Sequence, residues 1–203
     1  WLDSLSVPLR AYARANDRRP HATQVASAVV IYFAGDLGAH ERAADEADEA
    51  GEGEGGARWW YSPRRALRAA AVGAVAAVPA YRWFLWLGGG ALDVFPAGRA
   101  AGRAANLAAK VLVNQAVFTP VFNCYFFGMQ GALAGDGPAE VLDRLRRTVP
   151  ASWANSWKVW PAVTAVSFAF VPPQLRSVFA GVIAVGWQTY LSLLNQRAAL
   201  AEK

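Results

Sequence analysis

Polar and charged side chains interrupt the apolar runs of this chain, and they are the first candidates for chemistry. Asp36 follows Gly35 near the end of one apolar run, and Lys110 lies within another. An ionised side chain at the middle of a bilayer costs about 2.5–3.5 kcal/mol on insertion scales, so it normally faces a partner or a water-filled cavity. One hypothesis is that Asp36 and Lys110 line a pore as a pair. The alternative is that both lie at the membrane interface or pair for packing.

Three further polar residues occur in or beside apolar runs. Asn114 and Gln115 are neighbouring amides in the same run as Lys110, and Arg176 follows two prolines where a helix could begin. Interhelical hydrogen bonds of amides contribute about 0.6 kcal/mol on average in membrane bundles, so packing is favoured over transport for Asn114 and Gln115. The guanidinium of Arg176 could contact lipid phosphate, or it could bridge to Asp36 or to a neighbouring broken helix.

The sequence contains no recognisable catalytic or metal-binding set. Cys124 is the single cysteine, and His21 and His40 are the two histidines, so a zinc-type cluster cannot be assembled. No nucleophile has an obvious base beside it. The glycines at 88–90 lack the Gly-Lys-Ser/Thr that completes a phosphate-binding loop. We therefore expect a protein that is not an enzyme and that uses no cofactor or metal.

The composition is typical of an integral membrane protein. Hydrophobic residues make up 55% of the chain without counting glycine, and charged residues only 17%. A soluble protein has about 45–50% apolar residues with glycine included and about 25% charged residues. The nine tryptophans fit a membrane–water interface, where an apolar ring with a polar N–H is favoured. The net charge of +5 comes from arginines that mostly flank apolar runs. Such placement indicates contact with lipid headgroups and no nucleic-acid partner.

The elements that must position these residues are membrane helices. Because a bilayer needs about 20 apolar residues for a spanning helix, the apolar runs predict about four spans, at residues 23–37, 63–87, 103–131 and 175–194. We expect an all-α fold, namely one membrane domain over residues 1–203. It would be a bundle of these spans with amphipathic surface helices and one short, partly inserted helix. Lysine and arginine balance between the two sides of such a bundle, so the positive-inside rule does not orient it.

Four segments outside the spans complete the prediction. Residues 1–20 and 138–149 alternate apolar and basic side chains at helical spacing, which predicts two surface helices. Residues 153–171 carry an apolar stretch too short to cross a bilayer, which predicts a partly inserted or broken helix ending before Pro172. Residues 41–56 are acidic with interspersed alanine and glycine, which predicts a flexible, solvated loop.

Aromatic and proline residues near the C-terminus stand at a distinctive spacing. They are Trp157, Trp160, Pro161, Phe168, Val171, Pro172 and Arg176, followed by Trp187, Tyr190, Leu191 and Ser192. A second set lies upstream, and it comprises Tyr12, Pro20, Thr23, Gly35, Asp36, Trp83, Phe84, Gln115 and Pro120. With these positions, nearly the whole chain outside the acidic segment resembles the Mpv/PMP family. That family is named partly for a small peroxisomal membrane protein and has relatives in the mitochondrial inner membrane.

The resemblance implies a four-span helical protein of an organelle membrane, with no defining enzymatic activity. Several members of that family are thought to form small-molecule pores, so a small pore or solute pathway in organelle homeostasis is the implied function. The alternative is an accessory structural subunit of a larger mitochondrial or plastid membrane complex. The implied location is the mitochondrial inner membrane, with peroxisomal and plastid membranes as alternatives. Implied partners are membrane lipids and other membrane subunits or further copies of this chain.

Three positions depart from the pattern of that family. Asn114 stands where the family usually has aspartate, Thr164 where it has glutamine and Ser167 where it has asparagine. A pore lined by these residues would therefore be less polar than the resemblance implies, which favours the structural alternative.

Overall fold

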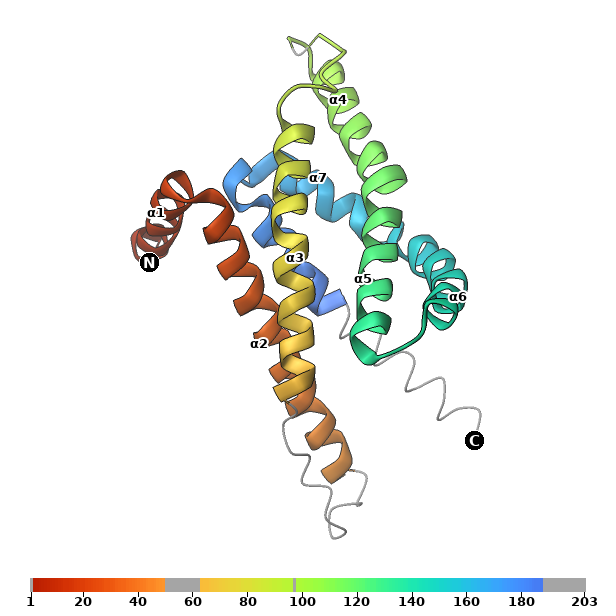
Figure 1. Cartoon of the computed structure of the whole chain (residues 1–203). Helices are drawn as coiled ribbons and strands as arrows, with labels where there is room; N and C mark the ends of the chain where they lie inside the picture. The colour runs from red at the N-terminus through yellow and green to blue at the C-terminus, as the bar shows by residue number, and fades with distance from the viewer. Residues whose placement is uncertain (1, 50–62, 97, 188–203) are drawn as a thin grey trace.

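A computed structural model describes residues 2–49, 63–96 and 98–187 of the chain. Within these ranges the regular structure is helical and no strand occurs (Figure 1). The prediction of an all-α fold is confirmed.

The first two helices meet at a sharp corner. α1 spans Leu2–Arg18 and α2 spans Pro20–Glu49. Pro20 suits the first turn of α2 because its missing N–H would have no partner there. α2 continues through residues 41–49, where the sequence predicted a loop. Alanine and glutamate dominate these residues and have high helix propensity, so the helix extends despite the acidic composition. Residues 50–56 lie outside the described ranges.

α2 runs beside α3, which spans Pro63–Gly88, over much of their length (Figure 1). Small residues bring the two backbones close together. A β-carbon added to Gly73 of α3 would lie 2.8 Å from Cγ of Tyr32 on α2. Helices in a membrane associate without a hydrophobic driving force, so close van der Waals packing at small residues holds them together. The contact between Gly73 and the Tyr32 ring is packing of this kind.

α4 (Ala100–Val113), the π-helical turn η1 (Asn114–Phe118) and α5 (Thr119–Ala134) form one continuous helical length. The turn has a local cause. The Thr119 N–H bonds to the carbonyl of Asn114, five residues back, and the next residue, Pro120, has no N–H to offer. α5 ends at Gly135, whose φ of +99° favours glycine.

The remaining helices follow a broken path. α6 (Pro138–Ser156) is longer than the predicted surface helix at 138–149, and a turn at residues 157–159 separates it from α7 (Trp160–Phe170). The predicted break within 153–171 is therefore confirmed. α7 packs against α4 and η1. After the short 3-10 turn η2 (Pro173–Leu175), residues 176–187 form a helix, called here the C-terminal helix.

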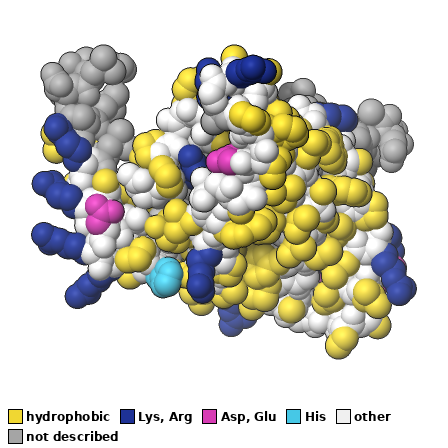
Figure 2. Space-filling model, turned by 90° about the horizontal axis from the view of Figure 1, so that it is seen from above, with side chains coloured by type: hydrophobic (Ala, Val, Ile, Leu, Met, Phe, Trp, Pro, Cys, Tyr) yellow, Lys and Arg dark blue, Asp and Glu magenta, His cyan; other side chains and the backbone are white. Residues whose placement is uncertain are grey.

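Two helical lengths in the described part of the chain are long and apolar enough to cross a membrane. They are Ala66–Gly88 and Ala100–Ala134, which coincide with the predicted spans at 63–87 and 103–131. Large apolar side chains such as those of Leu67, Val121 and Phe170 are exposed. Figure 2 shows hydrophobic side chains over much of the visible surface, with lysine and arginine gathered toward its edges. Lipid tails solvate such a surface and water does not.

The interior, in contrast, is rich in uncharged polar groups. Small or aromatic residues such as Val72, Ala77 and Phe84 share it with buried amides and hydroxyls. The buried polar residues are Asn16, Gln24, Asn106, Asn114, Gln115, Ser156, Thr164, Ser167 and Arg176. An unpaired polar group is unfavourable in hydrocarbon. The hydrogen bonds of these residues therefore separate those that hold helices together from those that are candidates for a functional site.

Candidate functional site

A cavity of about 110 Å³ lies at the centre of the helix bundle. Its walls come from α2, α3, η1, α5, α6, α7 and the C-terminal helix. The polar residues that line it are Gln24, Thr119, Asn114, Asn123, Ser152, Ser156, Thr164, Ser167 and Ser177. Aromatic rings, including those of Phe118, Phe122 and Trp160, supply the apolar part of the wall. None of the described residues that line the cavity carries a full charge at neutral pH.

The π-helical turn places Asn114 in the cavity wall. Its Oδ1 accepts a hydrogen bond from Trp83 Nε1 at 3.0 Å, and its Nδ2 donates to Thr164 Oγ1 at 3.3 Å. The Trp83 ring also stacks on Phe118, with centroids 5.6 Å apart. Asn114 is only 3% exposed, so this amide links α3, η1 and α7 while it contributes polarity to the wall.

Gln115 has a packing role. It is fully buried, and its Nε2 donates to Ser156 Oγ at 3.3 Å while its Oε1 accepts from Thr119 Oγ1 at 2.8 Å. In a π-helix the carbonyl of residue 115 accepts a hydrogen bond from the backbone N–H of residue 120. Residue 120 is a proline, which has no N–H, so the Gln115 carbonyl has no partner within the helix. Trp153 Nε1 on α6 donates to this orphaned carbonyl at 2.8 Å. The π-helical turn therefore creates the acceptor that ties α6 to the α4–α5 length.

Gln24 joins α1 and α2 to the start of the C-terminal helix. Its Nε2 lies 3.0 Å from Tyr12 Oη, 2.9 Å from Asn16 Oδ1 and 3.0 Å from the Gln174 carbonyl. Its Oε1 accepts from Ser177 Oγ. An amide nitrogen has only two hydrogens, so three acceptors share two donors. Burial raises the pKa of the Tyr12 phenol, which stays protonated at neutral pH.

Two lining residues keep unused hydrogen-bonding capacity. Ser167 Oγ on α7 and Asn123 Nδ2 on α5 are buried atoms without a partner among the described residues. Ser167 is only 2% exposed. A buried donor or acceptor left unpaired costs about 1–3 kcal/mol, so both atoms favour a polar occupant of the cavity.

The partner that the structure shows for Lys110 is a loop residue, whereas one of the two hypotheses paired this lysine with Asp36 in a pore. Its Nζ lies 2.7 Å from Asp93 Oδ1 in the connection between α3 and α4, and it does not line the cavity. Gly90, with a φ of +91°, helps this connection turn back toward α4. Lys110 is thus neutralised near the rim of the bundle. Asp36 belongs to α2, but its side chain lies outside the described part of the structure.

Arg176 bridges to the broken helix, as one of the hypotheses for it predicted. It is 8% exposed, its Nε donates to the Val171 carbonyl at 3.1 Å, and its guanidinium carbon lies 4.6 Å from the Phe168 ring centroid. Its Nη1 rests against Gly88 at the end of α3, where any β-carbon would overlap it. Arg176 therefore packs α7 against α3 and does not line the cavity.

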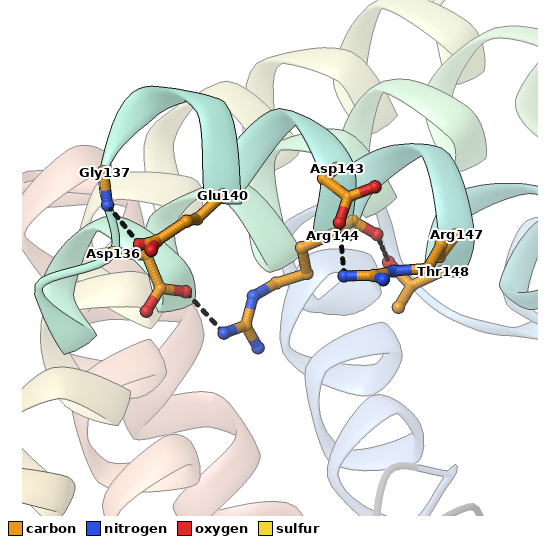
Figure 3. A network of polar contacts seen from close by, with 7 residues as sticks. All are labelled: Asp136, Gly137, Glu140, Asp143, Arg144, Arg147 and Thr148. Carbon is orange, nitrogen blue, oxygen red and sulfur yellow. Dashed lines mark hydrogen bonds and ion pairs between the residues drawn. The ribbon is translucent and has the colours of Figure 1, made fainter.

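Two of the three arginines of α6 form ion pairs with nearby carboxylates (Figure 3). Arg144 pairs with Asp136, and Arg147 Nη2 pairs with Asp143 Oδ2 one helical turn away. Glu140 caps the helix by accepting a hydrogen bond from the Gly137 N–H at 2.8 Å. These groups are solvent-accessible, so each ion pair contributes little to stability, and none of them lines the cavity.

The motif residues take several structural roles. Trp160 and Trp187 line the cavity, and Phe168 lies beneath Arg176. A β-carbon on Gly35 would overlap Val185, so this glycine lets α2 approach the C-terminal helix. Other members lie at helix ends or in turns, namely Pro120, Trp157, Pro161 and Pro172. Tyr190 and Ser192 lie outside the described residues.

Comparison with known proteins shows which family the chain resembles. Residues 131–192 match the Mpv17 / PMP22 family. Protein SYM1 of Yarrowia lipolytica is 26% identical over 91% of this chain and 78% of its own length. Protein sym-1 of Neurospora crassa is 37% identical over 43% of this chain, and PXMP2/4 family protein 3 of Dictyostelium discoideum is 36% identical over 42%. These two matches span 49% and 46%, about half, of the relatives' own lengths. No solved structure matches.

Fold, cavity and relatives together define an all-helical organelle-membrane protein. The chain resembles the Mpv17 / PMP22 family, as the spacing of its C-terminal aromatic and proline residues predicted. The match supports the mitochondrial inner membrane as its location, with the peroxisomal membrane as the alternative.

Proposed function

We propose that this protein provides a pathway for small solutes across an organelle membrane, with the central cavity as the solute site. The observation that carries the proposal is a cavity whose largely apolar wall contains several amides and hydroxyls, inside a bundle with large exposed apolar side chains. In a membrane, buried polar groups are favourable only where they meet partners or line a wet cavity. Ser167 and Asn123 keep unpaired atoms in this wall, which fits the second case.

The proposal includes four spans, formed by α2, α3, the α4–α5 length and the C-terminal helix. Ala100–Ala134 contains 35 residues, or about 52 Å at 1.5 Å per residue. The hydrocarbon core is about 30 Å thick, so this length extends beyond it or tilts. The ion pair of Lys110 with Asp93 fits a start of α4 outside the hydrocarbon.

The test is solute flux into liposomes that contain the purified protein, followed by stopped-flow light scattering. Ala77→Phe should slow the flux because Ala77 lines the cavity and is 7% exposed. Val75→Phe is the matched control, since Val75 lies on the same helix, is 55% exposed and does not line the cavity. Both variants should elute at the wild-type volume in size-exclusion chromatography, which shows that they are folded. Wild-type flux equal to that of protein-free liposomes, for every small solute tried, would reject the pathway.

A second hypothesis is an accessory subunit of a larger membrane complex. It rests on exposed apolar side chains such as those of Phe170 (81%) and Leu67 (71%), which could contact other subunits as well as lipid. Native electrophoresis after mild solubilisation of organelle membranes separates the two hypotheses. Co-migration with a large assembly would support the subunit, whereas a small band alone would count against it.

A further inference from the structure

We infer that the central cavity binds small, uncharged polar molecules and that the pathway therefore discriminates against ions. The inference rests on the proposed solute pathway and names its class of solute.

The charge of the wall is the first argument. The described lining residues offer amides, hydroxyls, aromatic rings and small or aliphatic side chains, but no charged group. Three cations close in sequence to lining residues are engaged elsewhere: Lys110 with Asp93, Lys158 with Asn155, and Arg176 with Val171 and Phe168. An ion that leaves bulk water loses far more solvation energy than a neutral molecule does, and only opposite charge or many dipoles can replace it. This wall therefore favours neutral occupants.

The unpaired hydrogen-bonding atoms are the second argument. Asn123 Nδ2 on α5 is a donor without a partner, and Ser167 Oγ on α7 can both donate and accept. A molecule with a carbonyl or hydroxyl oxygen would accept from Asn123 and exchange a hydrogen bond with Ser167. Thr164, one helical turn before Ser167, already accepts from Asn114, so this polar wall is held in place before an occupant enters.

The size of the cavity sets the third limit. A dry protein cavity of about 150 Å³ admits benzene, and the volume here is about 110 Å³. The occupant is therefore a molecule of about four to six heavy atoms. Rings such as those of Phe118 and Phe122 cover the carbon skeleton of such a molecule. Urea and glycerol combine this size with neutral polarity, and they are the probes for the test.

The experiment compares neutral and ionic permeation of the full chain in liposomes. Urea and glycerol fluxes are followed by light scattering, and potassium and chloride fluxes by encapsulated dyes. We expect neutral flux above that of protein-free liposomes without matching ion flux. Ion flux comparable to urea flux would overturn the inference and leave the solute pathway standing. Absence of all flux would reject the pathway, and the inference would then be decided by binding alone.

Binding is measured independently of transport by saturation-transfer NMR with glycerol and the detergent-solubilised protein. Ser167→Leu, which fills the cavity, should reduce binding and flux at least tenfold, whereas Ala169→Leu on the exposed face of α7 should change neither. Asn123→Leu, which preserves volume but removes the donor, should reduce glycerol binding about fivefold. If Ser167→Leu fails to fold, Ser167→Ala tests the hydroxyl with an expected effect of similar size to Asn123→Leu. No glycerol binding by wild type, or equal binding by all variants, would overturn the inference.

Discussion

Replacing Gln24 with leucine should weaken the junction between the N-terminal helices and the C-terminal helix. Leucine keeps nearly the same volume but removes the amide. Gln24 is 2% exposed, so water does not replace the lost partners. Its Nε2 donates two hydrogen bonds among three nearby acceptors, and its Oε1 accepts a third bond from Ser177.

The magnitude follows from these three bonds. At about 0.6 kcal/mol per hydrogen bond in a membrane bundle, Gln24→Leu should lower the free energy of unfolding by about 2 kcal/mol. Asn16 loses the donor to its Oδ1 but keeps its own bond to Tyr81 at 3.2 Å, so the neighbouring cluster is only partly disrupted. Because about 1.4 kcal/mol corresponds to a factor of ten, the ratio of folded to unfolded protein should fall roughly 30-fold.

The assay is reversible unfolding in mixed micelles by titration with a denaturing detergent, followed by circular dichroism and tryptophan fluorescence. Gln130→Leu is the matched control, since Gln130 is an exposed glutamine on α5. Ser177→Ala, combined with Gln24→Leu in a double-mutant cycle, isolates the bond that crosses to the C-terminal helix. Destabilisation by Gln24→Leu no greater than that by Gln130→Leu would refute this account of the junction.

Three further outcomes are expected in the same unfolding assay. Gly88→Val should lower stability by about 1–3 kcal/mol, because its side chain would overlap the Arg176 guanidinium; an unchanged midpoint would show that Arg176 does not pack there. Trp83→Phe and Asn114→Ala should show a coupling of at least 0.5 kcal/mol in a double-mutant cycle, from the 3.0 Å bond between them; additivity would contradict that bond. Gly135→Ala should cost about 1–2 kcal/mol, because its φ is +99°; no loss would mean that the end of α5 relaxes freely.

The sequence predicted the helices well where apolar runs and prolines mark their limits. The span expected at 63–87 corresponds to α3, at Pro63–Gly88. Pro63 marks the first turn of this helix, and the consecutive glycines at 88–90 mark its end. The break expected within 153–171 lies at 157–159. The end of α2 was misplaced because acidic composition was taken as the sign of a loop. Helix propensity acts on residues 41–49 independently of their charge.

The candidate site was predicted less completely, for reasons that are physical. Asn114 and Gln115 were recognised because amides are conspicuous in an apolar run, and both are buried. The sequence does not reveal that a π-helical turn gives them different roles. Lys110 was assigned no loop partner, because the path from Gly90 to Asp93 depends on backbone geometry without periodicity. The amides of Gln24 and Asn123 also lie in predicted spans, but each stands singly and was passed over, whereas Asn114 and Gln115 are adjacent.

The π-helical turn explains how the uncharged wall of the cavity can still be well ordered. Pro120 withholds an N–H from the preceding turn, which leaves the Gln115 carbonyl free for Trp153 and lets Asn114 bond across to Thr164. One proline thereby generates two interhelical links, and neither requires an ionised group. Charged links in such a place would each need a compensating charge inside the bundle. Amides and hydroxyls hold the helices with weaker fields, and this combination of order and neutrality is what the proposed discrimination between neutral solutes and ions would require.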